Sequence, residues 1–220
     1  CRHLQLVTPS AKDVADVLIN REGVSPAMAD YAARASQGHI GRARYLASDE
    51  TIRNRRDTII KLPMQINDVA SAFKAAETLL NLATEEAEVA ASARDEKEST
   101  ELAEAWGKGA TGRGMATGGS KAIKDLEKEQ KSRTTRMVRD YLDRALLDIA
   151  TLYRDILLIQ ANSLDSTINT DLISEITKIS NSTTPEATLA KLEAIMSART
   201  NLSHNAAPLL TIEALMVSLK

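Results

Sequence analysis

Apolar residues recur at intervals of three and four along most of the chain, which is the spacing of one face of an α-helix. After a short stretch, Arg2–Val7, whose weak alternation at Leu4 and Leu6 predicts a strand, every segment of regular pattern is helical. The first four predicted helices are short and lie close together in the sequence, at about Ser10–Gly23, Ser25–Gly38, Ile40–Ala47 and Glu50–Lys61.

The ends of these short helices carry recognisable signals. Ser10 with Asp13 three residues later forms a capping-box pattern, and Pro26 suits the first turn of the next helix. Gly23 and Gly38 are the expected terminators, because glycine adopts the left-handed conformation that ends a helix without steric cost. The four helices therefore predict a small bundle.

Pro63 interrupts the pattern, and the helices predicted beyond it are longer. The first has an inward face of Val69, Phe73, Ala76, Leu79, Leu80 and Ala83. Gly107–Ser120 is glycine-rich without apolar periodicity, and we expect it to be a mobile loop. The predicted long helices are about Asn67–Arg94 with a further segment to Trp106, Lys121–Asn162, Thr170–Ser180, Thr184–Asn201, and Ala207 to the end.

The composition agrees with an all-α protein and limits which partners and which cellular compartment we expect. Of 220 residues, 43% are hydrophobic but only 3% aromatic, a balance that favours alanine- and leucine-rich helices. The formal net charge of −2 gives no global electrostatic argument for binding nucleic acid or membranes, and no apolar run reaches membrane-spanning length. The single cysteine, Cys1, excludes an internal disulfide, and we expect a cytoplasmic setting. Because the chain lacks a starting methionine, we expect Cys1 to lie inside a longer protein.

Motifs for catalysis or metal binding are weak. Gly107–Gly112 matches G-x-G-x-x-G, but the dinucleotide fingerprint needs a preceding strand and a following helix, so we interpret it as part of the loop. No phosphate-binding P-loop motif occurs, and His3, His39 and His204 have no ligand spacing with other residues, so we expect no metal and no catalytic residue. A basic strip is read as a solvated helix face, with a DNA-facing strip as the alternative; it consists of Lys121, Lys124, Lys128, Lys131, Arg133, Arg136 and Arg139.

The turn from Gly38 to Arg44 is more informative. A Gly-x-x-Gly sequence opens a helix that carries Arg42 and Arg44 in its first turns. Cations near a helix N-terminus are unfavourable with the helix dipole. This placement suggests an external anion or acidic partner, with ordinary surface arginines as the other interpretation.

Several segments together resemble the delta-prime subunits of bacterial DNA polymerase III clamp loaders, of the actinobacterial type. Tyr31–Arg44 resembles the sensor-2 helix entry in the lid of AAA+ clamp loaders, and Lys128–Gln160 and Ala198–Leu210 resemble the collar. Cys1-Arg2 resembles the end of the Ser-Arg-Cys motif, whose arginine finger would precede Cys1. The resemblance covers the whole chain.

The resemblance implies the last strand of an AAA+ core at residues 1–7, a lid at 8–63 and a helical collar at 64–220. In ATP-hydrolysing clamp-loader subunits an arginine follows Gly-x-x, whereas this chain has Gly41 there and Arg42 about 100° further round the helix. The turn at Gly38, Gly41 and Arg42 is therefore expected to be a degenerate sensor. Residues expected in the collar core or a subunit interface are Tyr153, Arg154, Asp155, Arg199, Asn201, Asn205, Leu209, Ile212 and Met216.

The function implied by the resemblance is that of a non-catalytic stator. Its partners would be the gamma/tau and delta subunits, and through the assembled complex the sliding clamp and primed DNA, with no membrane contact. ATP would be bound by partner subunits, so no cofactor is expected in this chain. The alternatives are an ATP-hydrolysing gamma/tau subunit and a helical nucleic-acid-binding or scaffold domain.

Overall fold

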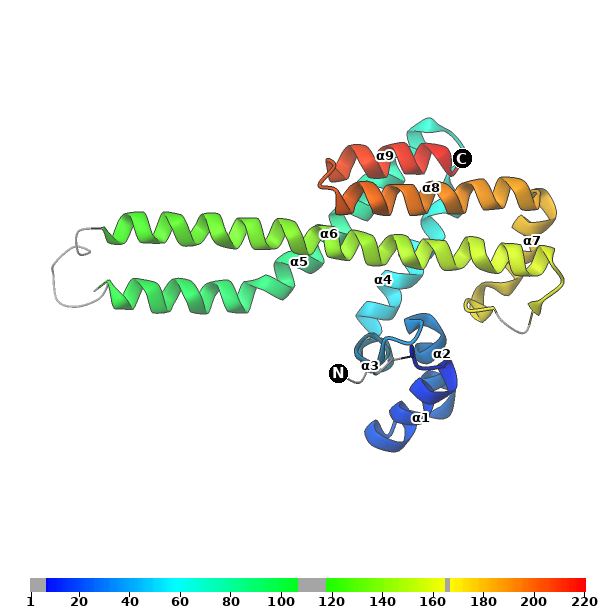
Figure 1. Ribbon diagram of the computed structural model, residues 1–220, viewed down its shortest axis with the longest axis horizontal. Coiled ribbons are helices and arrows are strands. Elements are labelled where there is room, and N and C mark those ends of the chain that lie inside the picture. Colours follow the sequence, from blue (N-terminus) through cyan, green and yellow to red (C-terminus); the bar gives the residue numbers. More distant parts are fainter. Residues whose placement is uncertain (1–6, 107–117, 165–166) are drawn as a thin grey trace, which may run out of the picture. The chain divides into compact units, whose positions relative to one another are not determined.

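The computed structural model describes residues 7–106, 118–164 and 167–220. Every regular element in these ranges is a helix (Figure 1), which confirms the all-α class. The chain forms two compact units. The first contains the chain up to Ile66 together with Leu146–Ser197, and the second contains Asn67–Ala145 together with Ala198–Ser218.

The first unit begins with the predicted small bundle, whose helices are α1 (Ala11–Glu22), α2 (Pro26–Ser36), α3 (Ile40–Ser48) and α4 (Glu50–Lys61). The capping box at Ser10 is present, and Gly23 ends α1 in the left-handed conformation. Pro63 lies in a short 3-10 helix, η1 (Leu62–Gln65), that follows α4. The bundle core is small and alanine-rich, and its buried members are Val14, Leu18, Ala29, Ala32, Ala33, Ala35, Ala43 and Leu46.

The rest of the first unit comes from later in the chain. It includes the C-terminal part of α6 (Gly119–Gln160), then η3 (Thr170–Leu172), α7 (Ile173–Ser182) and most of α8 (Pro185–Ser203). Its fully buried aliphatic side chains are Leu146, Ile149, Leu152, Ile156, Ile176 and Ile195.

The second unit is built on α5 (Val69–Ala105), which packs against α9 (Pro208–Ser218). α5 also contacts the N-terminal part of α6 through hydrogen bonds and ion pairs. Asp68 caps α5 through a reciprocal pair of hydrogen bonds with Ser71. Ile212, Leu215 and Met216 are the buried residues of α9.

The distal parts of α5 and α6 run side by side as a helical hairpin (Figure 1). The amide of Gln130 donates to the Asp95 carbonyl oxygen at 3.0 Å and to the Ser99 hydroxyl at 3.3 Å. Arg133 bridges to the carboxylates of Asp95 and Glu98. These contacts fix an antiparallel register. Nearer the base of the hairpin, the small residues Ala83, Ala87 and Ala91 of α5 are buried.

Some predictions of burial and extent were wrong. Val69 and Phe73 are exposed rather than inward-facing, whereas the exposure of Leu209 leaves its predicted place in the core or a subunit interface open. Val69 and Leu209 lie in first helical turns, where side chains lean towards the N-terminus and past the packed part of the helix, and Phe73 lies about 100° round the helix from buried Ala72. α5 also continues without a break past Arg94 to Ala105.

Other predictions remain open. Cys1 and most of the predicted strand at 2–7 lie outside the described residues, as do Gly107 and Gly112 and most of the predicted loop; α6 already begins at Gly119, two residues earlier than predicted. The chain passes between units at Ile66, close to the predicted boundary at Pro63, but the first unit also includes Leu146–Ser197. The assignment of lid and collar stays a prediction. Among the described residues, no helix is both long enough and apolar enough to cross a bilayer.

Candidate functional site

The tight turn between α2 and α3 sets the position of Arg42. Gln37 and Gly38 both have positive φ, 52° and 87°. A Cβ atom added to Gly38 would lie 2.9 Å from the Pro9 carbonyl oxygen and would clash with the Thr8 methyl carbon. Only glycine fits here, because both the backbone conformation and the space exclude a side chain.

His39 caps α3, with its Nδ1 accepting a hydrogen bond from the Arg42 amide at 3.1 Å. A Cβ on Gly41 would lie 3.2 Å from the His39 ring, so a larger residue there would press on the cap. A side chain at position 41 would therefore point towards the His39 cap, whereas the Arg42 side chain points away from the turn.

Asp148 of α6 is the centre of a buried charged cluster in the first unit. The Arg42 guanidinium donates to both oxygens of this carboxylate. Arg56 of α4 donates through Nε to Asp148 Oδ1 at 3.2 Å. Both Arg56 and Asp148 are about 4% exposed or less. A carboxylate removed from water in this way is tolerated because two guanidinium groups compensate its charge.

The cluster continues from Arg56 to a second buried carboxylate. Arg56 Nη2 donates to Asn169 Oδ1 at 2.7 Å, and Asn169 Nδ2 donates to Asp155 Oδ2 at 2.8 Å and to Thr151 Oγ1 at 3.1 Å. Asp155 also accepts the backbone N–H groups of Ile168 and Asn169. The segment before η3 is thereby tied to α6.

These hydrogen bonds leave the buried polar atoms satisfied, as a stable polar network requires. The Arg56 guanidinium also lies 5.8 Å from the centroid of the Tyr31 ring, and Arg154 reaches Asp155 at 3.2 Å from the surface. In the described part of the chain, no group of three or more His, Cys, Asp or Glu is arranged to hold a metal ion. The arrangement is that of a structural junction, which we call the Asp148 junction: Arg42, Arg56, Asp148, Thr151, Asp155 and Asn169.

Tyr153 lies in the core of the first unit. Burial raises the pKa of its phenol. The Lys191 ammonium lies 5.9 Å from the centroid of the Tyr153 ring and donates to the Leu219 carbonyl oxygen at 2.8 Å. Partial burial lowers the pKa of Lys191.

The remaining predicted site residues belong to the second unit. Arg199 Nε donates to Asp143 Oδ1 at 2.7 Å, and a second bond of 3.1 Å joins Nη2 to Oδ2. Asn201 is exposed. Asn205 has a φ of 64° and ends the helical turn before α9 by donating its N–H to the Leu202 carbonyl oxygen. Ile212 and Met216 are fully buried.

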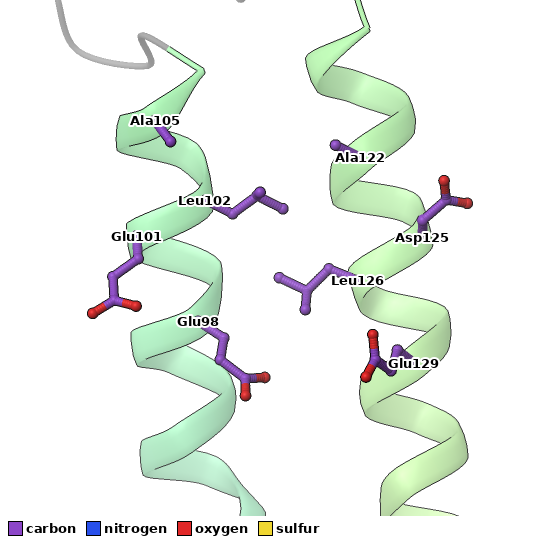
Figure 2. A pocket seen from close by; sticks show the side chains of 8 residues that line it. All are labelled: Glu98, Glu101, Leu102, Ala105, Ala122, Asp125, Leu126 and Glu129. Carbon is purple, nitrogen blue, oxygen red and sulfur yellow. The ribbon is translucent and has the colours of Figure 1, made fainter.

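A groove between the distal parts of α5 and α6 combines apolar and acidic side chains. Figure 2 shows Leu102 and Leu126 pointing towards one another across it. Hydrogen bonds from Arg133 and Arg94 lower the pKa of Glu98 to about 2. The groove is lined by Glu98, Glu101, Leu102, Ala105, Ala122, Asp125, Leu126 and Glu129.

Sequence reasoning missed most of the Asp148 junction. It singled out Arg42 and Asp155, which the structure brings into one network, but not Arg56, Asp148 or Asn169. A signal was present, because Asp148, Thr151 and Asp155 follow one another at spacings of three and four on an otherwise apolar face of α6. Polar residues at core spacing indicate a buried network.

Comparisons of the chain with protein-family models, with curated proteins and with solved structures find no match in any of the three. By its fold, the chain is an all-α protein of two units. The first unit contains the buried Asp148 junction, and the second contains a long helical hairpin.

Proposed function

We propose that this chain is a non-catalytic part of a bacterial DNA polymerase III clamp loader, with the lid and collar roles of a delta-prime subunit. In this role it helps to hold a ring of subunits together while partner subunits bind ATP and the ring places a sliding clamp on primed DNA. The support comes from sequence resemblance and from an arrangement of four short helices followed by long ones.

The observation that carries the proposal is the engagement of Arg42. Gly41 stands where ATP-hydrolysing subunits place an arginine, and the neighbouring Arg42 is bound to Asp148 within its own unit. The other arginine of the turn, Arg44, pairs with Glu22. Breaking a buried arginine–carboxylate pair is costly, so Arg42 is poorly suited to serve a nucleotide phosphate. This favours a stator over the gamma/tau alternative.

Reconstitution tests the proposal. The purified chain is mixed with gamma/tau and delta subunits, and complexes are analysed by size-exclusion chromatography. We expect co-elution, with apolar collar surface buried between subunits. Absence of any complex at micromolar concentration would contradict the proposal.

Variants of exposed apolar residues sharpen this test. Leu210 of α9 is 66% exposed and Phe73 of α5 is 47% exposed, so Leu210→Asp and Phe73→Asp should leave folding intact and weaken assembly. Val89→Asp is the matched control, because Val89 is exposed but lies on the hairpin. Loss of assembly in the control alone would place the interface elsewhere.

A further inference from the structure

One face of the distal part of α6 carries a row of four lysines. Lys121, Lys124, Lys128 and Lys131 are separated by three, four and three residues, so they share one side of the helix. At a rise of 1.5 Å per residue the row is about 15 Å long. All four residues are exposed, and within the described part of the chain none of them forms an ion pair.

The lysine row faces away from the rest of the hairpin. Ala122, Leu126 and Gln130 are the residues of this part of α6 that line the groove or bond to α5. At 100° per residue, the lysines lie on the opposite side of the helix from these three. Of the three acids in this stretch, Asp125 and Glu129 line the groove. Glu127 lies three residues from Lys124 and four from Lys131, on the flank of the row.

The two sides of the hairpin differ strongly in charge. Residues 85–104 of α5 include eight acidic and two basic side chains, whereas residues 121–139 of α6 include seven basic and three acidic ones. A polyanion is therefore attracted to the outer face of α6 and repelled from α5. The overall net charge of −2 conceals this separation.

We propose that the lysine row of α6 binds the phosphate backbone of duplex DNA. Lysine is a compact cation that binds phosphate as a point charge. A row of four such cations along one helix face matches the regularly repeated charge of a phosphate backbone. No aromatic residue occurs between Trp106 and Tyr141, so base stacking does not contribute and binding is independent of sequence.

The choice of DNA over RNA rests on the proposed function, in which the chain works at primed DNA. The binding itself rests only on the charge geometry. Four lysine–phosphate contacts predict a slope of about −3.6 for log K against log salt. Affinity should therefore fall about 150-fold between 50 and 200 mM salt.

Fluorescence anisotropy with a labelled 20-base-pair duplex of arbitrary sequence, about 20 being long enough to cover the row, tests the proposal. The wild-type chain should bind at 50 mM salt with the slope given above. Replacing Lys121, Lys124, Lys128 and Lys131 by glutamine, which preserves helix propensity, should weaken binding roughly tenfold or more. A variant with Lys12, Lys74, Lys178 and Lys220 replaced by glutamine is the matched control, because it removes the same charge from exposed positions outside the row, and its affinity should stay close to wild type.

Several outcomes would overturn the proposal. Equal loss of affinity in both variants would mean that total charge, and not the row, is responsible. No duplex binding at 50 mM salt would mean that the row is only a solvated helix face. Tighter binding of labelled polyglutamate than of the duplex would mean that the row binds an acidic protein. Tighter binding of an RNA duplex than of DNA would overturn the choice of DNA. Reconstitution with the gamma/tau and delta subunits is measured without DNA, so failure here is distinguishable from failure of the proposed function.

Discussion

At the scale of single residues, Asp148 is the central residue of the first unit's charged network, because its buried carboxylate pairs with two arginines. Asp148→Ala leaves Arg56 buried without its ionic partner. We expect it to lower the free energy of unfolding by about 3–5 kcal/mol, the usual effect of removing one member of a buried ion pair. Urea denaturation followed by circular dichroism measures this change.

Asp143→Ala is the control for that experiment. It removes a carboxylate of the same type from the Arg199 pair, but the Asp143 side chain is 41% exposed. Exposed pairs contribute less than about 1 kcal/mol. Equal effects of the two substitutions would show that burial at Asp148 has no energetic consequence.

Gly38 offers a second test at this scale. Gly38→Ala should destabilise the first unit by more than Gly23→Ala, although both glycines have positive φ. At Gly23 an added Cβ meets no atom within 4 Å, so only the conformational cost of about 1–2 kcal/mol applies. At Gly38 the same cost is joined by the close approach to Pro9 and Thr8. Equal urea midpoints for the two variants, or a lower midpoint for Gly23→Ala than for Gly38→Ala, would contradict this account.

At the scale of elements, α9 is held by its buried stripe. Met216 is fully buried, and Met216→Ala should cost about 2–5 kcal/mol of stability through the cavity that it leaves. Leu210→Ala, on the exposed side of the same helix, should change stability little. Urea unfolding compares the two, and unchanged stability of Met216→Ala together with unchanged assembly would exclude the stripe from both core and interface.

The hairpin should lose stability in acid. Arg133 and Arg94 lower the pKa of Glu98 from its usual 4.5 to about 2, so the folded hairpin holds this carboxylate ionised more strongly than the unfolded chain does. The resulting stabilisation is complete above about pH 4.5, decreases as the pH falls, and is lost below about pH 2.

Thermal unfolding followed by circular dichroism at several pH values measures the effect. The melting temperature of wild type should exceed that of Glu98→Gln at pH 6, and the two should converge at pH 2. Glu104→Gln, an exposed position on the same helix outside this ion pair, should keep the acid profile of wild type. A difference between wild type and Glu98→Gln that persists unchanged at pH 2 would exclude the ion pair as its cause.

Helix positions could be predicted largely because their ends are encoded locally. Ser10 with Asp13 and Pro26 mark helix starts in both sequence and structure. The continuity of α5 past Arg94 was harder to predict, because its distal part is held to α6 by ion pairs and has no continuous apolar stripe. Asp95 and Glu98 find their partner 38 and 35 residues further along the chain, and local periodicity contains no such information.

The Asp148 junction shows the same limit more strongly. Arg56 looks like a solvent-facing residue of α4 in the sequence, yet it is buried because Asp148 and Asn169 approach from 92 and 113 residues away. Burial of a charge depends on its compensation by tertiary partners. The turn that presents Arg42 was predictable from Gly38, whereas the group that receives Arg42 was not.

At the scale of the whole molecule, the proposed stator role predicts that the chain does not bind ATP. Equilibrium dialysis with labelled ATP and Mg²⁺ should show no saturable binding at concentrations up to about 1 mM, the upper range of ordinary nucleotide affinities. The expectation follows from the absence of a P-loop sequence and from the engagement of Arg42 with Asp148. Stoichiometric, tight binding would contradict it.

The distant partners of Arg42 and Arg56 also impose an order on synthesis. Translation at 5–20 residues per second delivers Asp148 roughly 5–18 seconds after Arg56, a separation of 92 residues. Until then, Arg42 and Arg56 lack the carboxylate that they share in the finished structure. The first unit can therefore be completed only after the hairpin has been synthesised, and a premature stop before residue 148 would leave both arginines without this partner.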